Sequence, residues 1–302
     1  MGSLVGGSVD LIAVYTLLLA VSLWLNGIVI VAAQPLPVLF RPLRNPRLLG
    51  GSLAIDVVLV PATILALAWL SSGITHEIRV GLVVIAAASA GPIGSVLVRI
   101  VRGDQPLAVS LITAFGGLNL VTVPLLGAVL LRATVPFPVG PVATSMMALV
   151  IAPLVCGYVW ARVRGWRQVS AERQSRLLRR ISAASSLSLS AAIMIAVTFD
   201  FARVIELLLG PVGLLSVVTM TVIATAAYCV GRTFDERATL TVVLNARGAG
   251  LALIVGALHF SQMDDVRATV LAFSVVTQVV PSLLVLIAKR WSNHAKGGRT
   301  AA

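Results

Sequence analysis

Long apolar segments separated by short polar ones run along the whole chain. Nine of these segments have about 20 residues or more, the length that an α-helix needs to cross about 30 Å of hydrocarbon. Their approximate limits are 9–33, 47–71, 79–101, 106–131, 139–162, 181–200, 207–230, 238–260 and 267–289. The pattern predicts an all-α membrane protein with about nine transmembrane helices, which form a single membrane domain over residues 1–302.

The composition supports an integral membrane protein rather than a soluble one. Of the 302 residues, 58% are hydrophobic and only 11% are charged, outside the usual range of soluble domains. The formal net charge is +12, but the positive residues lie mostly in short loops at predicted helix ends. This distribution follows the positive-inside rule for membrane proteins, so we expect no nucleic-acid partner.

Basic residues are concentrated in every second loop. The segment 163–180 contains the most of them and is predicted to be the main cytoplasmic loop, attracted to the headgroups of membrane lipids. The alternation places the C-terminus in the cytoplasm and the N-terminus outside, and we expect the membrane to be a bacterial inner membrane. Residues 291–302 are predicted to form a flexible C-terminal tail.

Two of the predicted spans contain residues that interrupt a helix. The span 79–101 has the sequence "GPIGS" at its centre, and the span 238–260 has "NARGAG" at a comparable depth. Because glycine and proline weaken or break a helix, both spans are predicted to be broken. The residues of the breaks, predicted to line a substrate cavity, are Gly91, Pro92, Gly94, Ser95, Asn245, Gly248 and Gly250.

The predicted orientation makes the two broken spans run in opposite directions through the membrane. Such a pair is typical of secondary transporters built from inverted repeats, in which the ion or substrate site lies where the breaks cross. Close packing of small residues is the alternative explanation, and it accounts for the glycines. It does not account for Arg247, because a charge at a helix centre costs about 2.5–3.5 kcal/mol on insertion scales.

Three stretches of the sequence resemble the bile acid:sodium symporter family. They read "NGIVIVAAQPLPVLFRPLRNPRLLGGSLAIDVVLVPATILALAWL", "GLVVIAAASAGPIGSVLVRIVRGDQPLAVSLITA" and "ARGAGLALIVGALHF". Their order and spacing carry the resemblance from about residue 20 to residue 290. The first of the ten helices common in the family has no counterpart in this chain.

The resemblance implies a fold similar to that of sodium/proton antiporters, with a panel and a core. The panel would take roughly residues 9–33 and part of 139–200, and the core roughly 47–131 and 207–289. The two broken helices would cross in the core. The resemblance also implies a secondary active or facilitative transporter that moves a small or amphipathic organic anion by alternating access.

Family members bind two sodium ions, and the resemblance also shows which positions would hold them. In this chain those positions carry Asp56, Gly94, Ser95, Ala108, Ile112, Val243 and Arg247. Sodium prefers several hard oxygen ligands, which the aliphatic side chains among these do not supply. A guanidinium would repel a cation in the same cavity. We therefore expect no sodium coupling, no metal and no cofactor.

Asp56 and Arg247 replace two ligands that share one sodium ion in the family. Two buried charges are far less costly together than apart, so the sequence predicts an ion pair between them. Three roles remain open for this pair: a structural lock, a proton-coupling site at Asp56, or direct binding of the substrate anion by Arg247. Other polar residues that could line the cavity are Thr113, Asn119 and Thr122.

Two other functions are compatible with the sequence. One is a monovalent cation/proton antiporter of related fold, since "NARG" in a broken helix is also similar to some of those proteins. The other is a membrane receptor or sensor that has lost transport. No nucleophile–base or metal-binding constellation is found, so an enzyme is not expected.

Overall fold

The computed structural model describes residues 4–32, 45–71, 73–131, 138–162 and 170–297. This part of the chain folds into helices joined by short connections. In chain order they are α1 (Leu4–Ala32), α3 (Pro46–Leu53), η2 (Ala54–Leu59), α4 (Val60–Leu70), α5 (His76–Ala87), α6 (Ile93–Ile100), α7 (Gln105–Leu131), α8 (Val139–Met146), η3 (Met147–Ile151), α9 (Ala152–Arg162), α11 (Ala171–Leu209), α12 (Pro211–Val230), α13 (Phe234–Asn245), α14 (Ala249–His259) and α15 (Asp264–Gly297). No strand occurs among these residues, which agrees with the predicted all-α class.

Six stretches of continuous helix are long and apolar enough to cross a membrane. They are Leu11–Ala32, Pro46–Leu70, Gln105–Leu130, Val139–Arg162, Pro211–Val230 and Asp264–Lys289. The chain is therefore an integral membrane protein. The other three predicted spans coincide with α11 and with two pairs of shorter helices, α5 with α6 and α13 with α14.

Two segments expected outside the helices are helical. Helix α11 begins at Ala171, so the second half of the predicted loop 163–180 belongs to it, and its first half lies outside the described residues. The side chain of Ser170 caps this helix, and the residues that follow are mostly strong helix formers. Helix α15 continues to Gly297, through part of the predicted tail 291–302.

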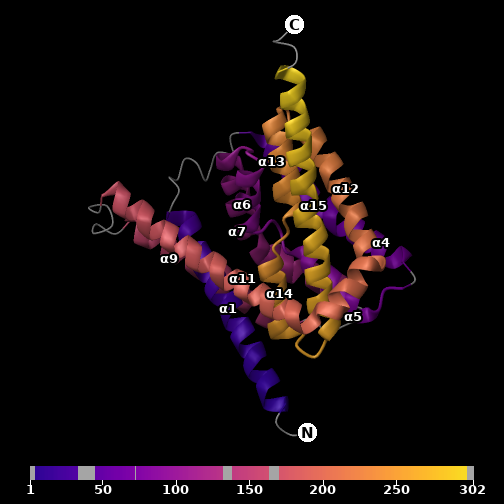
Figure 1. Cartoon of the computed structure of the whole chain (residues 1–302). Helices are drawn as coiled ribbons and strands as arrows, with labels where there is room; N and C mark the ends of the chain where they lie inside the picture. The colour runs from indigo at the N-terminus through magenta and orange to yellow at the C-terminus, as the bar shows by residue number, and fades with distance from the viewer. Residues whose placement is uncertain (1–3, 33–44, 72, 132–137, 163–169, 298–302) are drawn as a thin grey trace.

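The helices can be divided into two groups, which contact each other mainly through α11 with α15, α7 with α8, and α1 with α14 (Figure 1). In the first, which we call the α1 group, α1 packs along α11 and α9, and α8 and η3 precede α9. The second, the crossing group, contains α3, η2, α4, α5, α6, α7, α12, α13, α14 and α15. Helices α1 and α9 cross closely at Gly157, which has no Cβ atom. A Cβ atom there would lie only 2.6 Å from the carbonyl oxygen of Ile28.

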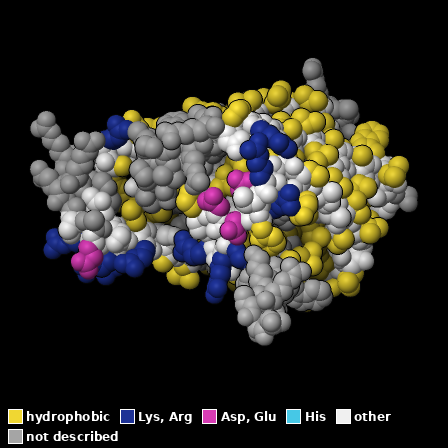
Figure 2. Space-filling view, turned by 90° about the horizontal axis from the view of Figure 1, so that it is seen from above, with side chains coloured by type: hydrophobic (Ala, Val, Ile, Leu, Met, Phe, Trp, Pro, Cys, Tyr) yellow, Lys and Arg dark blue, Asp and Glu magenta, His cyan; other side chains and the backbone are white. Residues whose placement is uncertain are grey.

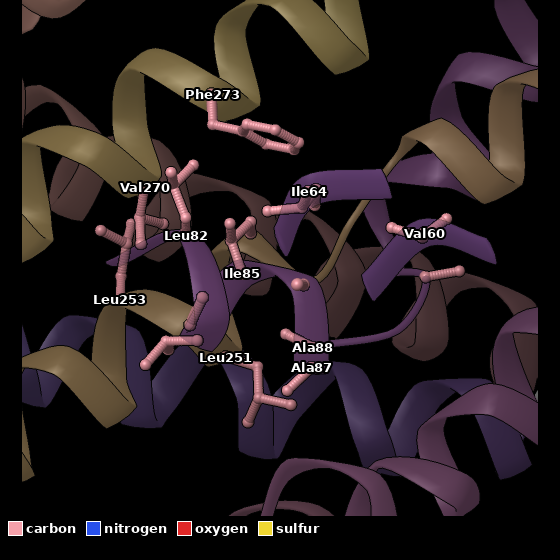
Figure 3. Close-up of a cluster of buried hydrophobic side chains, with 14 of the residues drawn as sticks. Val60, Ile64, Leu82, Ile85, Ala87, Ala88, Leu251, Leu253, Val270 and Phe273 are labelled. Carbon is pink, nitrogen blue, oxygen red and sulfur yellow. The ribbon is translucent and has the colours of Figure 1, made fainter. Parts of the chain in front are cut away.

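Helix α5 lies at the centre of the crossing group. Its residues from Val80 to Ala87 are all buried, which explains why the sequence there is apolar on every side rather than on one face. Figure 3 shows the buried cluster to which it belongs, with labelled side chains from α4, α5, α14 and α15. The fully buried Leu82 of α5 belongs to this cluster with Ile64 of α4 and Phe273 of α15.

One end of the molecule carries a concentration of charged side chains. We call it the basic end; it is where α6 and α15 end and α13 begins, at the top of Figure 1. Viewed from this end, charged side chains of both signs gather near the middle, with hydrophobic ones to the right and a second charged group at the left edge (Figure 2). Here the Lys289 ammonium lies 3.0 Å from Asp235 and 2.7 Å from the carbonyl oxygen of Arg102.

Candidate functional site

The two predicted breaks are present, and they lie against each other. One interrupts the chain between α5 and α6, and the other between α13 and α14. Ala90 in the first break and Arg247 in the second form an antiparallel β-bridge. Two segments more than 150 residues apart in the chain therefore cross inside the protein. In Figure 1 the second break lies between α13 and α14.

Each break satisfies backbone groups of the other. The Gly91 N–H donates to the carbonyl oxygen of Ala246 at 2.7 Å, and the Gly248 N–H donates to that of Ala88 at 3.3 Å. Irregular backbone at membrane depth requires such partners, because hydrocarbon offers none. Each broken helix thus depends on the other for the hydrogen-bond partners of its irregular backbone.

Two of the predicted glycines are needed for the crossing itself. A Cβ atom at Gly91 would lie 3.0 Å from the Cα of Gly248, and one at Gly248 would lie 2.8 Å from the carbonyl oxygen of Ser89. Both distances are too short for a larger residue unless the backbone moves. Gly250 serves a different purpose, because its face is directed toward Leu189 of α11, in the α1 group.

Helix α7 supplies side chains that complete the first break. The Asn119 carbonyl oxygen accepts a hydrogen bond from the Ser89 N–H at 2.7 Å, and the Thr122 hydroxyl donates to the carbonyl oxygen of Ala87 at 3.3 Å. Thr113, by contrast, donates to the carbonyl oxygen of Val109 in its own helix. Asn119 and Thr122 therefore hold the first break in place.

Gln278 of α15 completes the second break. Its side-chain amide donates to the carbonyl oxygen of Arg247 at 3.3 Å. The side-chain amide N–H of Asn245, at the end of α13, donates to the backbone carbonyl oxygen of Thr241, one turn earlier. The side-chain oxygen of Asn245 has no hydrogen-bond partner among the described residues. Gln278 lies in a long apolar helix, where a lone glutamine gives no signal of its partner.

The structure places Asp56 and Arg247 in an ion pair. Nη1 of Arg247 donates to Oδ1 of Asp56, and both side chains have no exposed area. The second carboxylate oxygen, Oδ2 of Asp56, is buried and has no hydrogen-bond partner among the described residues. The guanidinium also donates from Nη2 to the carbonyl oxygen of Ala86 at 2.5 Å and from Nε to that of Ile85 at 3.4 Å.

These two carbonyl groups belong to the last turn of α5. The C-terminal end of a helix carries a partial negative charge, since its last carbonyl groups lack helical partners. The guanidinium is therefore held between a full negative charge and a partial one. This arrangement explains how a permanent positive charge is accommodated at the centre of a membrane protein.

Asp56 lies in a π-helical turn that the sequence did not predict. The turn η2 spans Ala54–Leu59, between α3 and α4. The next residue but one, Pro61, has no N–H group, and its ring would clash with the carbonyl group four residues earlier. A widened turn just before the proline relieves this clash, and such turns are frequent at functional sites.

Of the other positions that the resemblance assigns to sodium, Gly94, Ala108, Ile112 and Val243 offer no side-chain oxygen. A Cβ atom at Gly94 would lie 3.5 Å from Cδ1 of Ile112 and 3.6 Å from the Cα of Val243, so these residues surround one point. Ile112 and Val243 are buried, as is Ala108. The Ser95 hydroxyl donates to the carbonyl oxygen of Pro92. No group of three His, Cys, Asp or Glu residues suited to a metal ion occurs in the described ranges.

A cleft of about 100 Å³ lies between the α1 group and the crossing group, beside the breaks. Its walls are largely aliphatic. The α1 group contributes Ser22, Leu23, Asn26, Leu189 and Ile193 among others, and the crossing group contributes Pro92, Thr113, Asn119, Gly250 and Gln278 among others. Four residues predicted to line the cavity are not among its lining residues: Gly94, Ser95, Thr122 and Asn245.

Two helix N-termini face this cleft. Ile93 begins α6 and Ala249 begins α14, and both residues line the cleft. Helix N-termini carry partial positive charges and free N–H groups, which favour anions. Arg247 also contributes to the wall, but its side chain has no exposed area, so its charge is directed to Asp56 rather than into the cleft.

Apolar spans, two broken helices that cross and a cleft beside them together define an integral membrane protein built like a secondary transporter. The sequence matches the model of the Sodium Bile acid symporter family over residues 21–207, which is more than half of the chain, and the protein belongs to this family. It is thus a transporter of the bile acid symporter type. The match ends before the second break, so Arg247 lies beyond it. A search of curated proteins found no significant match.

Proposed function

We propose that this protein transports a small or amphipathic organic anion by alternating access, without coupling to sodium. The observation that carries the proposal is the buried ion pair at the helix crossing. Asp56 and Arg247 stand where the resemblance puts two ligands of one sodium ion, and they contact each other. The guanidinium thus supplies, from within the chain, the positive charge that the ion supplies in relatives.

A sodium ion has no favourable place beside this pair. The Asp56 carboxylate already contacts a guanidinium, and a second positive charge about 4 Å away would cost about 4 kcal/mol at an effective dielectric constant of 20. Around Gly94 the space is bounded by carbon atoms of Ile112, Val243 and Ala246 rather than by oxygen. Both arguments favour a carrier that operates without this ion.

We further propose nine transmembrane segments arranged as inverted repeats, with the α1 group as the panel and the crossing group as the core. The start of α1 and the end of α15 lie at opposite ends of the molecule, as an odd number of spans requires (Figure 1). The basic end would face the cytoplasm of a bacterial cell. Movement of one group against the other would then expose the cleft to each side in turn.

The walls of the cleft support an organic anion as the substrate. Aliphatic side chains such as Leu23, Leu189 and Ile193 suit an apolar body, and the N-termini of α6 and α14 suit a negative group. Because the Arg247 side chain is not exposed, direct binding of the anion by its guanidinium is disfavoured in this conformation. The pair then acts as a structural lock for the crossing.

Proton coupling is a second candidate, and one observation favours it. Oδ2 of Asp56 is buried without a hydrogen-bond partner among the described residues, so this oxygen is free to take a proton if the pair opens. The same observation fits a cation/proton antiporter of related fold. A receptor or sensor that has lost transport would keep the pair and the cleft but move no solute.

Uptake into proteoliposomes tests these candidates together. The purified protein would be offered labelled carboxylates, sterol acids and sulfated anions, with sodium and proton gradients imposed separately. We expect uptake of an anion that is unchanged when sodium is replaced by choline. Uptake that requires sodium would overturn the proposal, uptake driven only by a pH gradient would favour proton coupling, and ligand binding without transport would favour the sensor.

A further inference from the structure

Two ion pairs join the α1 group to the crossing group, at the end opposite the basic end. Arg203 of α11 donates to both carboxylate oxygens of Asp265 in α15, at 2.7 and 2.6 Å. Asp200 of α11 accepts from Nε of Arg267 in α15 and from its Nη2 at 2.9 Å. Both contacts are bidentate, the stronger geometry for an arginine and a carboxylate.

The four residues form a matched set. Each helix contributes one acid and one base, and because α11 and α15 run in opposite directions, the earlier charge of α11 meets the later charge of α15. Arg203 has a further contact with Glu206, 2.8 Å away in its own helix. The exposed fractions of the Asp200 and Asp265 side chains are only 11% and 18%, so solvent screens these pairs less than ordinary surface pairs.

The pairs lie on one side of the cleft. On α11, Leu189 and Ile193 line the cleft, and Asp200 follows Ile193 by seven residues, which is about 10 Å along a helix. On α1, Ser22 lines the cleft, and Tyr15 lies about 10 Å before it. The pairs therefore close the interface between the two groups beyond the cleft, on the side away from the basic end.

Tyr15 of α1 lies beside the Asp200–Arg267 pair. Tyr15 and Arg267 line the same cavity of about 190 Å³, together with residues of α11. Tyr15 is buried, and its hydroxyl has no hydrogen-bond partner among the described residues. A buried hydroxyl without a partner is unfavourable, unless another conformation supplies one.

We infer that Asp200, Arg203, Asp265 and Arg267 form the gate that closes the cleft toward the end opposite the basic end. The inference rests on the proposed function, because alternating access requires the two helix groups to move against each other. Since each pair has one partner in each group, such a movement must separate both. The Tyr15 hydroxyl is then placed to bond to a side chain that the separation frees.

Access of a thiol reagent to the cleft tests the gate without a known substrate. A single cysteine would replace Leu23 in the cleft, after Cys156→Ala and Cys229→Ala, and a membrane-impermeant reagent would be added from either side of oriented vesicles. We expect labelling mainly from the basic side in this reference protein. The double change Asp200→Asn with Arg203→Gln neutralises the α11 partner of each pair. It should increase labelling from the other side by roughly fivefold or more.

A charge exchange separates a gate from a merely structural contact. Asp200→Arg or Arg267→Asp alone places like charges together and should increase labelling from the far side. The two changes combined restore an ion pair and should return labelling to the reference level. The matched control is Asp235→Asn with Lys289→Gln, which breaks an ion pair inside the crossing group and should leave far-side labelling unchanged.

Several results would overturn the inference. One is far-side labelling that stays at the reference level after the gate is neutralised. Another is a charge exchange that behaves like the single changes. Labelling that falls on both sides in the neutralised protein, but not in the exchanged one, would make the pairs purely structural. A failure of the transport assay alone would count against the proposed function and leave these labelling results to decide the gate.

Discussion

Nη1 of Arg247 donates a hydrogen bond to Oδ1 of Asp56, a residue 191 positions earlier in the chain. Neither side chain has any exposed area, and the other donors of the guanidinium are directed to the carbonyl groups that end α5. One side chain thus connects a π-helical turn, the end of one broken helix and the break in another. The charge of Arg247 is thus one of several elements that hold the crossing together.

Removing one partner of this pair should destabilise the protein strongly. Asp56→Asn or Arg247→Gln leaves the other charge buried without compensation, which typically costs 3–5 kcal/mol. The free energy of unfolding of each variant in detergent measures the effect. Asp56→Asn combined with Arg247→Gln removes both charges and should cost less than the two single changes added together. Strictly additive costs would show that the two residues do not act as a pair.

Alanine at either crossing glycine should disrupt the site. Gly91→Ala and Gly248→Ala each bring a methyl group to 3.0 Å or less from backbone atoms of the opposite break, so the two breaks must separate. We expect each change to lower the free energy of unfolding in detergent by about 1–3 kcal/mol. Gly117→Ala on α7 is the control, since a methyl group there meets no atom within 4 Å. Equal effects at all three positions would argue against a close crossing.

Asn119 should matter through the hydrogen bond it accepts. Asn119→Leu leaves the Ser89 N–H buried without its partner, which should cost about 1–3 kcal/mol. Thr113→Val, which removes only a bond within α7, should cost less. Unfolding of both variants in detergent compares the two. The prediction fails if the Thr113 change costs as much as the Asn119 change.

Much of the fold could be predicted from the sequence, because each feature has a local signal. The apolar segments mark the helices, and "GPIGS" and "NARGAG" mark the two breaks. A pairing of Asp56 with Arg247 could also be expected, because the family resemblance puts both at ligands of one sodium ion and each charge lies in an apolar stretch. The segment 171–180 was predicted to be a loop because it is basic, although its residues favour a helix.

Other features depend on contacts that no local pattern encodes. The π-helical turn at Asp56 arises from the way α3 and α4 are accommodated around Pro61. Gln278 caps a break that lies in another helix, and nothing in its own neighbourhood indicates this. The pairs between α11 and α15 depend on two antiparallel helices meeting in one register, which becomes visible only once they are packed.

Replacing the ion pair by two amide side chains should produce a response to sodium. Asp56→Gln with Arg247→Gln would bring two amide oxygens to the crossing, and the carbonyl groups of Ile85 and Ala86 would be free to join them. Ligand binding stabilises the folded state, by about 1.4 kcal/mol when the ligand is at ten times its dissociation constant. We expect sodium chloride, but not choline chloride, to raise the melting temperature of this variant. No difference between the two salts would show that further substitutions are needed.

The same titration on the unaltered protein tests the central claim most directly. If the Asp56–Arg247 pair occupies the place of the bound ion, sodium chloride and choline chloride should change the melting temperature equally at every concentration. A saturable rise in melting temperature with sodium alone would mean that the ion still binds beside the crossing. That result would contradict the replacement of sodium by the arginine.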